Sequence, residues 1–123
     1  MIAENQRNIT NKKKVLMVQG LHEEGQKLFH ARDDIEPITI MSSDEDEIIE
    51  AAKDVHGITV RTANISRKII ENAKNLLIVS RHGVGYDSID VDALNDSGIP
   101  LAIAAHSNMI SVAEHAMFML LAL

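Results

Sequence analysis

Two glycines around one valine, Gly83-Val84-Gly85, form the segment of this 123-residue chain best suited to bind a small anion. Glycine lets the backbone turn sharply and lets a ligand approach where a Cβ atom would obstruct it. Consecutive amide N–H groups in such a turn can point together at an anion, for which a carboxylate is the natural choice. The same pattern is also typical of a strand-to-helix turn that binds nothing, and by itself it does not separate the two interpretations.

Arg61 is the second candidate for chemistry, because it follows the apolar segment Ile58-Thr59-Val60 directly. A guanidinium group can hold a carboxylate or phosphate through two parallel hydrogen bonds. A surface arginine that pairs with a neighbouring acid is the commoner alternative. Taken alone, Arg61 favours that alternative.

A metal site is a weaker hypothesis for the residues after the glycine loop. His82, Asp87 and Asp90 lie close in sequence, but a turn former and a helix N-cap explain the two aspartates more simply. Asn108, or Ser107 before it, is predicted to cap the last helix, with contact to a cofactor as the alternative. The chain has no cysteine, which excludes disulfides, zinc-thiolate sites and thiol catalysis.

The elements that would position these residues alternate between strand and helix. Apolar, β-branched segments predict strands over 15–18, 35–41, 58–62, 76–80 and 101–104, and helices are predicted between them and over 107–123. Ser42 and Glu45 have capping-box spacing at the second helix, Ser66 and Asp90 are predicted caps, and Pro37 indicates an edge strand. This order predicts an α/β fold with a doubly wound parallel five-stranded sheet. Arg61 and the glycine loop then lie beyond the carboxyl ends of the strands, where such sheets bind ligands.

Composition narrows the possible partners. The net charge of −6 opposes binding to nucleic acid or to an anionic membrane, and three aromatic residues are too few for stacking bases. The polar first 13 residues lack the apolar stretch of a signal peptide, so a cytoplasmic location is expected. The segment 110–123 is too short to span a bilayer, but it is apolar on nearly all sides. It is therefore predicted to be buried on several sides, inside a larger fold.

The residues from Asn75 to Asp90 match a specific family. This string resembles the D-isomer-specific 2-hydroxyacid dehydrogenases, particularly their phosphoglycerate dehydrogenase branch. The flanking segments 60–73, 92–100 and 108–115 resemble the same family, and the similarity extends from about Lys14 to the end of the chain.

The resemblance implies a flavodoxin-like substrate-binding lobe over 14–106, after a polar tail over 1–13. It implies that the loop beginning at Gly83 binds the carboxylate of a 2-oxo acid through the amides of Val84 and Gly85, with Arg61 as a second anion contact. Val84 would also approach the nicotinamide of NAD, and Asn108 would lie near the cofactor. Residues 107–123 would form the helix between two domains, truncated before the NAD-binding domain, so the sheet is incomplete relative to the family.

The function implied by the resemblance is that of the N-terminal substrate-binding segment of an NAD-dependent dehydrogenase acting on a 2-hydroxy acid. The family's dinucleotide-binding turn and its catalytic Arg, Glu and His have no counterpart in these 123 residues, so the chain is expected to be inactive and to bind no cofactor alone. A stand-alone binding module for small carboxylates and a non-functional remnant are the alternatives. Association through 107–123, with another copy or with the missing C-terminal half, is also expected.

Overall fold

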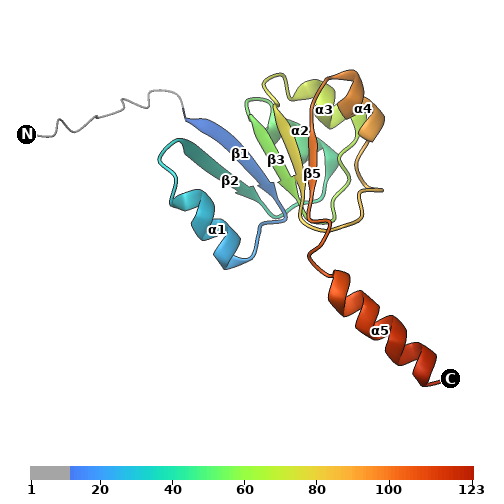
Figure 1. The fold of residues 1–123 in the computed structure, drawn as a ribbon. Coiled ribbons are helices and arrows are strands. Elements are labelled where there is room, and N and C mark those ends of the chain that lie inside the picture. The colour runs from blue at the N-terminus through green and yellow to red at the C-terminus, as the bar shows by residue number, and fades with distance from the viewer. Residues whose placement is uncertain (1–11) are drawn as a thin grey trace, which may run out of the picture.

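A computed structural model describes residues 12–123 (Figure 1), so most of the predicted tail over 1–13 lies outside the described residues. Strands and helices alternate through the whole described chain, as predicted. Their bounds are β1 Lys13–Val18, α1 Glu23–His30, β2 Ile35–Ile40, α2 Glu45–Ala52, β3 Gly57–Val60, α3 Arg67–Asn72, β4 Ile78–Arg81, α4 Val91–Asp96, β5 Leu101–Ile103 and α5 Met109–Leu121.

The strands form one parallel five-stranded sheet in the order β2-β1-β3-β4-β5. In this order β1 lies between β2 and β3, as it does in flavodoxin-like folds. The order confirms the predicted fold class. The strand β2 lies at an edge, as Pro37 indicated, since proline cannot donate a backbone hydrogen bond to a second neighbour. In the centre of the sheet, β3 is buried along its whole length and β1 over its last three residues, which is why these stretches are mainly apolar.

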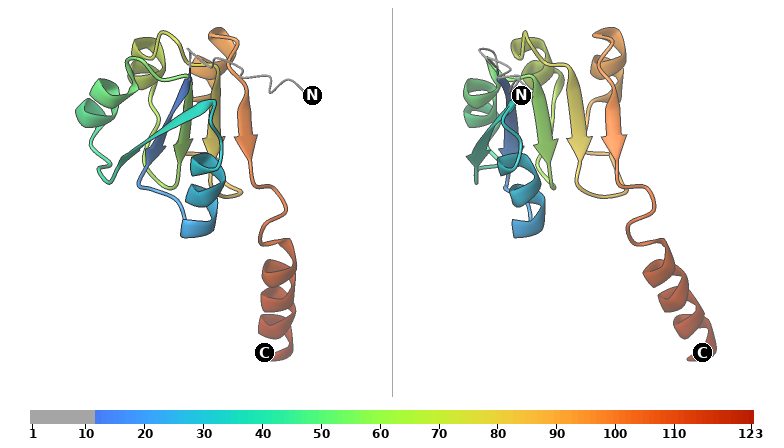
Figure 2. Two further views of the ribbon diagram at one scale, coloured as in Figure 1. Left: turned by 90° about the vertical axis from the view of Figure 1, so that its left-hand side faces the viewer. Right: turned by 60° about the vertical axis from the view of Figure 1, so that its left-hand side comes forward.

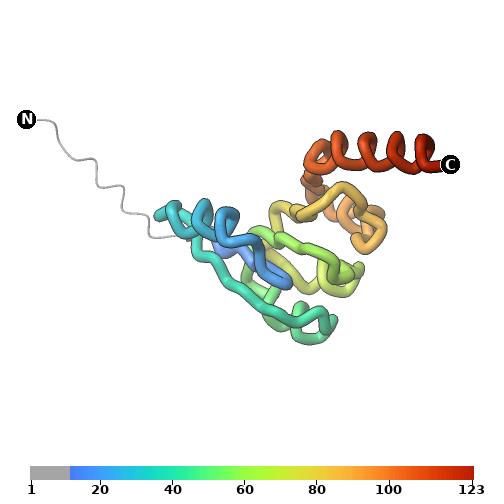
Figure 3. Tube along the Cα trace, turned by 90° about the horizontal axis from the view of Figure 1, so that it is seen from below, coloured from blue at the N-terminus to red at the C-terminus, as the bar shows by residue number. Residues whose placement is uncertain are grey.

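The hydrophobic core lies on one face of the sheet, beneath α2, α3 and α4. Successive side chains of a strand point to opposite faces, so Leu16, Val18, Ile58 and Val60 point into this core. Ile48 of α2 and other buried helical residues pack against them. Seen from below, α1 lies on the side of the sheet opposite to α2 (Figure 3). The second face is therefore covered by one short helix and remains partly open.

The last helix, α5, stands beyond the carboxyl end of the sheet, away from the core (Figure 2). Sequence periodicity predicted burial on several sides, but every residue of α5 is exposed within the described chain, Leu121 by 82%. None of residues 12–108 packs over the helix, so its predicted burial inside a larger fold stays a prediction. No helix of the described chain combines the length and apolar character needed to cross a membrane.

The helix caps agree with the sequence at α4 and differ at α2 and α3. Asp90 accepts a hydrogen bond from the amide of Ala93 at 2.8 Å, as predicted. The cap of α2 is Asp44 rather than Ser42, because its Oδ1 accepts from the amides of Asp46 and Glu47, both at 3.1 Å. The hydroxyl of Ser42 accepts from the amide of Asp44 instead, so the predicted capping box does not form. At α3, Ser66 occupies the cap position, but its hydroxyl donates to a carboxylate of Glu45.

Candidate functional site

The strands β3 and β4 bring Arg61 and His82 to the same edge of the sheet. Val60 pairs with Arg81 in the parallel register, so the next residue of each strand lies just beyond the carboxyl ends. The amide of His82 also donates to the carbonyl of Val60 at 2.8 Å. The predicted strand over 58–62 ends two residues early, at Val60, which places Arg61 on the loop rather than within the strand.

A small hollow of about 280 Å³ opens at this edge. It is lined by Gln19, Gly20, Leu21, His22, Arg61 and His82, and no carboxylate is among the lining residues. Arg61 is exposed, and its guanidinium makes no ion pair or hydrogen bond with the rest of residues 12–123. The alternative of a surface arginine paired with a neighbouring acid is therefore not what the structure shows. A cation without a counter-ion in an acid-free hollow favours an anionic ligand.

The glycine loop offers two backbone donors rather than three. The amide of Gly83 donates to the carbonyl of Arg81 at 2.9 Å, and its own carbonyl accepts from the amide of Ala104 at 3.0 Å. The amides of Val84 and Gly85 donate to no acceptor within the described chain. Both residues are exposed. The two amides that an anion-binding loop would need are thus available, although the loop does not line the hollow around Arg61.

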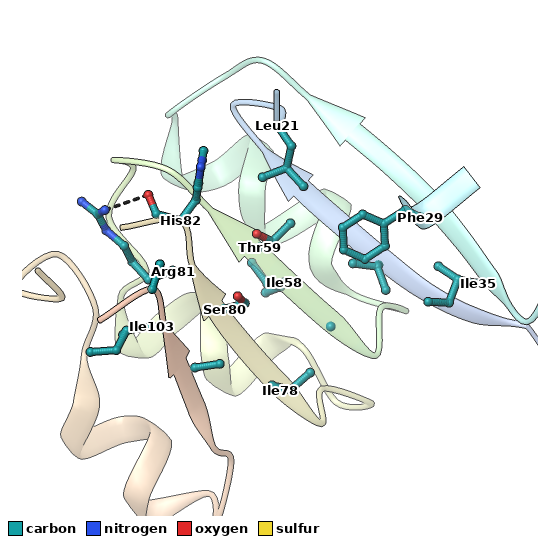
Figure 4. Close-up of a pocket in the computed structure, with 14 residues that line it drawn as sticks. Leu21, Phe29, Ile35, Ile58, Thr59, Ile78, Ser80, Arg81, His82 and Ile103 are labelled. Carbon is teal, nitrogen blue, oxygen red and sulfur yellow. Dashed lines mark hydrogen bonds between the residues drawn. The ribbon is translucent and has the colours of Figure 1, made fainter. Parts of the chain in front are cut away.

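Arg81 is a feature of the site that sequence reasoning missed. Its Nη1 donates to the carbonyl of His82 at 2.9 Å, a contact drawn as the dashed line in Figure 4. The guanidinium lies so close to Gly83 that a Cβ atom there would meet Nη1 at 1.3 Å. Its Nε is buried and has no hydrogen-bond partner among the described residues. Gly83 therefore makes room for Arg81, and the signal in the sequence was an arginine two residues before a glycine.

Gln19 is a second missed residue, and it lines the same hollow as Arg61. Its side chain accepts a hydrogen bond from the amide of Thr62, which follows Arg61 and lies 43 residues after Gln19 in the chain. A glutamine at the end of an apolar strand carries no motif that would single it out.

A larger cavity of about 520 Å³ lies on the open face of the sheet, between α1 and the strands β3, β4 and β5 (Figure 4). Its lining is mainly apolar, with Phe29 on one side and Ile78 and Ile103 on the other. Arg81 and His82 line its carboxyl end, and Thr59 and Ser80 add hydroxyl groups within the strands. The cavity is the part of the second face that α1 leaves uncovered.

Asn108 lies apart from the residues just described. It occupies the N-cap position of α5, but its side chain makes no capping hydrogen bond and is exposed. Its predicted contact with a cofactor, like that of Val84, stays a prediction. Among residues 12–123, no group of three or more His, Asp or Glu side chains is placed to hold a metal ion.

Comparison with known proteins relates this geometry to one group of enzymes. The catalytic domain of the D-isomer specific 2-hydroxyacid dehydrogenases matches residues 15–119. The D-3-phosphoglycerate dehydrogenase of Methanocaldococcus jannaschii is 36% identical over 110 residues, which cover 89% of this chain and 21% of that protein. The hydroxypyruvate reductase of Thermotoga maritima is 34% identical over 103 residues, 83% of this chain and 33% of the reductase.

Solved structures show the same fold. The NAD+-bound 3-phosphoglycerate dehydrogenase of Entamoeba histolytica superposes with a TM-score of 0.75 at 27% identity, covering 89% of this chain and 38% of that one. The NAD-dependent formate dehydrogenase of Staphylococcus aureus, in complex with NAD, gives a TM-score of 0.73 at 28% identity, covering 87% and 37%. The chain spans about a fifth of the length of the first curated relatives that it matches.

Proposed function

The chain belongs to the D-isomer specific 2-hydroxyacid dehydrogenase family, and from this premise we propose that it forms the substrate-binding part of an enzyme interconverting a 2-hydroxy acid and a 2-oxo acid. The substrate carboxylate binds at the carboxyl edge of the sheet. The amides of Val84 and Gly85 donate to one side of the carboxylate, and the guanidinium of Arg61 holds a second anionic group or the other oxygen. The observation that carries the proposal is the exposed guanidinium of Arg61, which has no acidic partner in the described chain. The unused amides of Val84 and Gly85 lie on the loop that follows β4, the strand next to β3.

These residues would bind and orient the substrate rather than transfer a proton. Fixing the carboxylate at two points sets the direction of the C1–C2 bond and so places C2 at a defined position beyond the edge of the sheet. NAD, when bound, supplies the hydride acceptor. Val84 and Asn108 are the residues of this chain that we propose lie near it, and both are exposed in the structure.

The polypeptide of these 123 residues is expected to bind a 2-oxo acid without reducing it. Its sequence contains no Gly-x-Gly-x-x-Gly turn of the kind that binds the pyrophosphate of a dinucleotide. A mixture of the pure chain, NADH and hydroxypyruvate should therefore keep its absorbance at 340 nm. A decrease above the buffer rate would contradict this part of the proposal.

Binding itself is tested by titrating the chain with hydroxypyruvate and with 3-phosphoglycerate, followed by backbone amide NMR and by calorimetry. We expect the amide signals of Val84 and Gly85 to shift. The substitution Arg61→Gln should weaken binding about tenfold, since one hydrogen-bonded charge contributes roughly 1.5 kcal/mol. Arg67→Gln is the matched control, because that exposed arginine pairs with Asp96 away from the hollow.

Two results would contradict the proposal. Equal affinity of the Arg61→Gln variant and the unmodified chain would remove Arg61 from the site. Shifts confined to residues outside 61–87 would place the binding elsewhere.

A further inference from the structure

We propose that Gln19 is a positioning residue, which sets the direction of the Arg61 guanidinium by fixing the loop that follows it. The inference rests on the function proposed above, because it gives Gln19 a purpose only if Arg61 binds an anion. Gln19 touches no substrate in this proposal and acts through Arg61.

The side chain of Gln19 makes four hydrogen bonds. Its Oε1 accepts from the amide of Thr62 at 2.7 Å, from the amide of Ala63 at 2.9 Å and from the hydroxyl of Thr62 at 3.1 Å. Its Nε2 donates to the hydroxyl of Ser43 at 3.1 Å. One side chain at the end of β1 thus joins the loops that follow β2 and β3.

These bonds begin immediately after Arg61. The last residue of β3 is Val60, whose carbonyl accepts from the amide of His82 at 2.8 Å. The next two amides after Arg61 donate to Gln19 instead of to a neighbouring strand. Arg61 is therefore the single residue between the sheet and a segment held by Gln19, so its backbone has little freedom to turn. A fixed backbone confines the long side chain to fewer directions and lowers the entropy lost when it binds a ligand.

The backbone of Gln19 supports a functional interpretation. Its φ is +67°, the only positive φ of a non-glycine residue in the described chain. Residues with a Cβ atom seldom adopt this conformation, and those that do are concentrated at functional sites. The conformation here coincides with hydrogen bonds from both the oxygen and the nitrogen of the side chain and with a place in the lining of the hollow.

The test uses two substitutions that separate length from chemistry. Gln19→Asn keeps an amide group and tolerates positive φ well, but it is one methylene shorter and cannot span the distance to Thr62 and Ala63. Gln19→Glu keeps the length and the acceptor oxygen. We expect hydrogen exchange of the Thr62 and Ala63 amides to accelerate in the asparagine variant and to stay slow in the glutamate variant.

Affinity then distinguishes positioning from general stability. In the full 123-residue chain, Gln19→Asn should raise the Kd for hydroxypyruvate about fivefold. The other amide signals in the NMR spectrum should keep the positions typical of the folded chain. In an Arg61→Gln background the same substitution should change the Kd by less than about twofold, because the residue through which Gln19 acts is gone. Ser43→Ala, which removes only the bond to Nε2, is the matched control and should leave the affinity unchanged.

The outcomes are distinct. Faster exchange with an unchanged Kd would show that Gln19 only stabilises the loop, and it would overturn the inference while leaving the proposed function intact. An equal effect of Gln19→Asn in both backgrounds would overturn it as well. An unmodified chain that binds neither hydroxypyruvate nor 3-phosphoglycerate would overturn the proposed function and this inference together.

Discussion

Gly83→Ala is expected to destabilise the chain, because the added methyl group would occupy the position of the Arg81 guanidinium. An ideal Cβ at Gly83 lies 1.3 Å from Nη1 and 2.6 Å from Cζ of Arg81, so the two groups cannot coexist. The guanidinium has to turn away, and its hydrogen bond to the carbonyl of His82, 2.9 Å long, is lost.

The size of the effect follows from what is lost. A hydrogen bond involving a charged group contributes about 1.5–3 kcal/mol, and because Arg81 is partly exposed we expect this one to fall just below that range, at about 1–1.5 kcal/mol. The steric cost adds little, since a flexible side chain can move into solvent. Gly85 provides the control in the same loop, because a Cβ there meets only Oδ2 of Asp87, at 3.8 Å. Gly85→Ala should change the free energy of unfolding by less than about 0.5 kcal/mol.

Urea unfolding of a double-mutant cycle measures the effect directly. The cycle consists of the unmodified chain, Gly83→Ala, Arg81→Ala and the double variant. Any free-energy cost of placing alanine in the backbone conformation of Gly83 is the same with and without Arg81, so it cancels in the coupling energy. We expect a coupling energy of about 1 kcal/mol. The reasoning is refuted if Gly83→Ala costs as much without Arg81 as with it, or no more than Gly85→Ala.

Two further predictions concern groups outside the site. Asp44→Ala should lower the free energy of unfolding by about 1 kcal/mol, and Ser42→Ala by less than half of that, because only Asp44 accepts the first amides of α2; thermal unfolding would rank them. Arg32 donates hydrogen bonds to Asp34 and so holds the pKa of the Asp34 carboxyl below its ordinary value. The stabilisation from this pair is therefore present at neutral pH and is lost as the pH falls through the lowered pKa. Arg32→Gln should raise that pKa in an NMR titration of Asp34, and an unchanged value would contradict the prediction.

The fold could be predicted from the sequence because its signals are local. Each strand is a short apolar segment followed by a helix with a cap or a glycine, and such repetition leaves a parallel sheet as the simple solution. The shared edge of Arg61 and the glycine loop follows from that topology. The predicted strand ends and helix caps were less accurate, because they depend on which of several nearby polar groups accepts the hydrogen bond of a given amide. Asp44 and Ser42 illustrate this, since both stand before α2 and only the structure shows which one accepts its first amides.

The organisation inside the site depends on contacts between residues far apart in sequence. Gln19 and Thr62 are separated by 43 positions, and the packing of Arg81 over Gly83 depends on a side-chain direction. The first has no pattern in the sequence, and the second has only an arginine two residues before a glycine, which does not give the direction of the side chain. The burial expected for α5 is a different case. Its apolar pattern indicates that the helix packs against other elements, but it does not identify those elements.

The two halves of the candidate site are joined by backbone hydrogen bonds as well as by the sheet. The amide of Ile65 donates to the carbonyl of Ser88 at 2.8 Å, and the amide of Asp90 donates to the carbonyl of Ile65 at 2.9 Å. The loop that carries Arg61 is therefore fixed to the exit of the glycine loop by bonds that do not depend on which side chains are present. Backbone pairing sets how far the guanidinium can be from the amides of Val84 and Gly85. Its direction within that range depends on the bonds from Gln19, so a substitution there should change affinity for an anion while leaving the sheet intact.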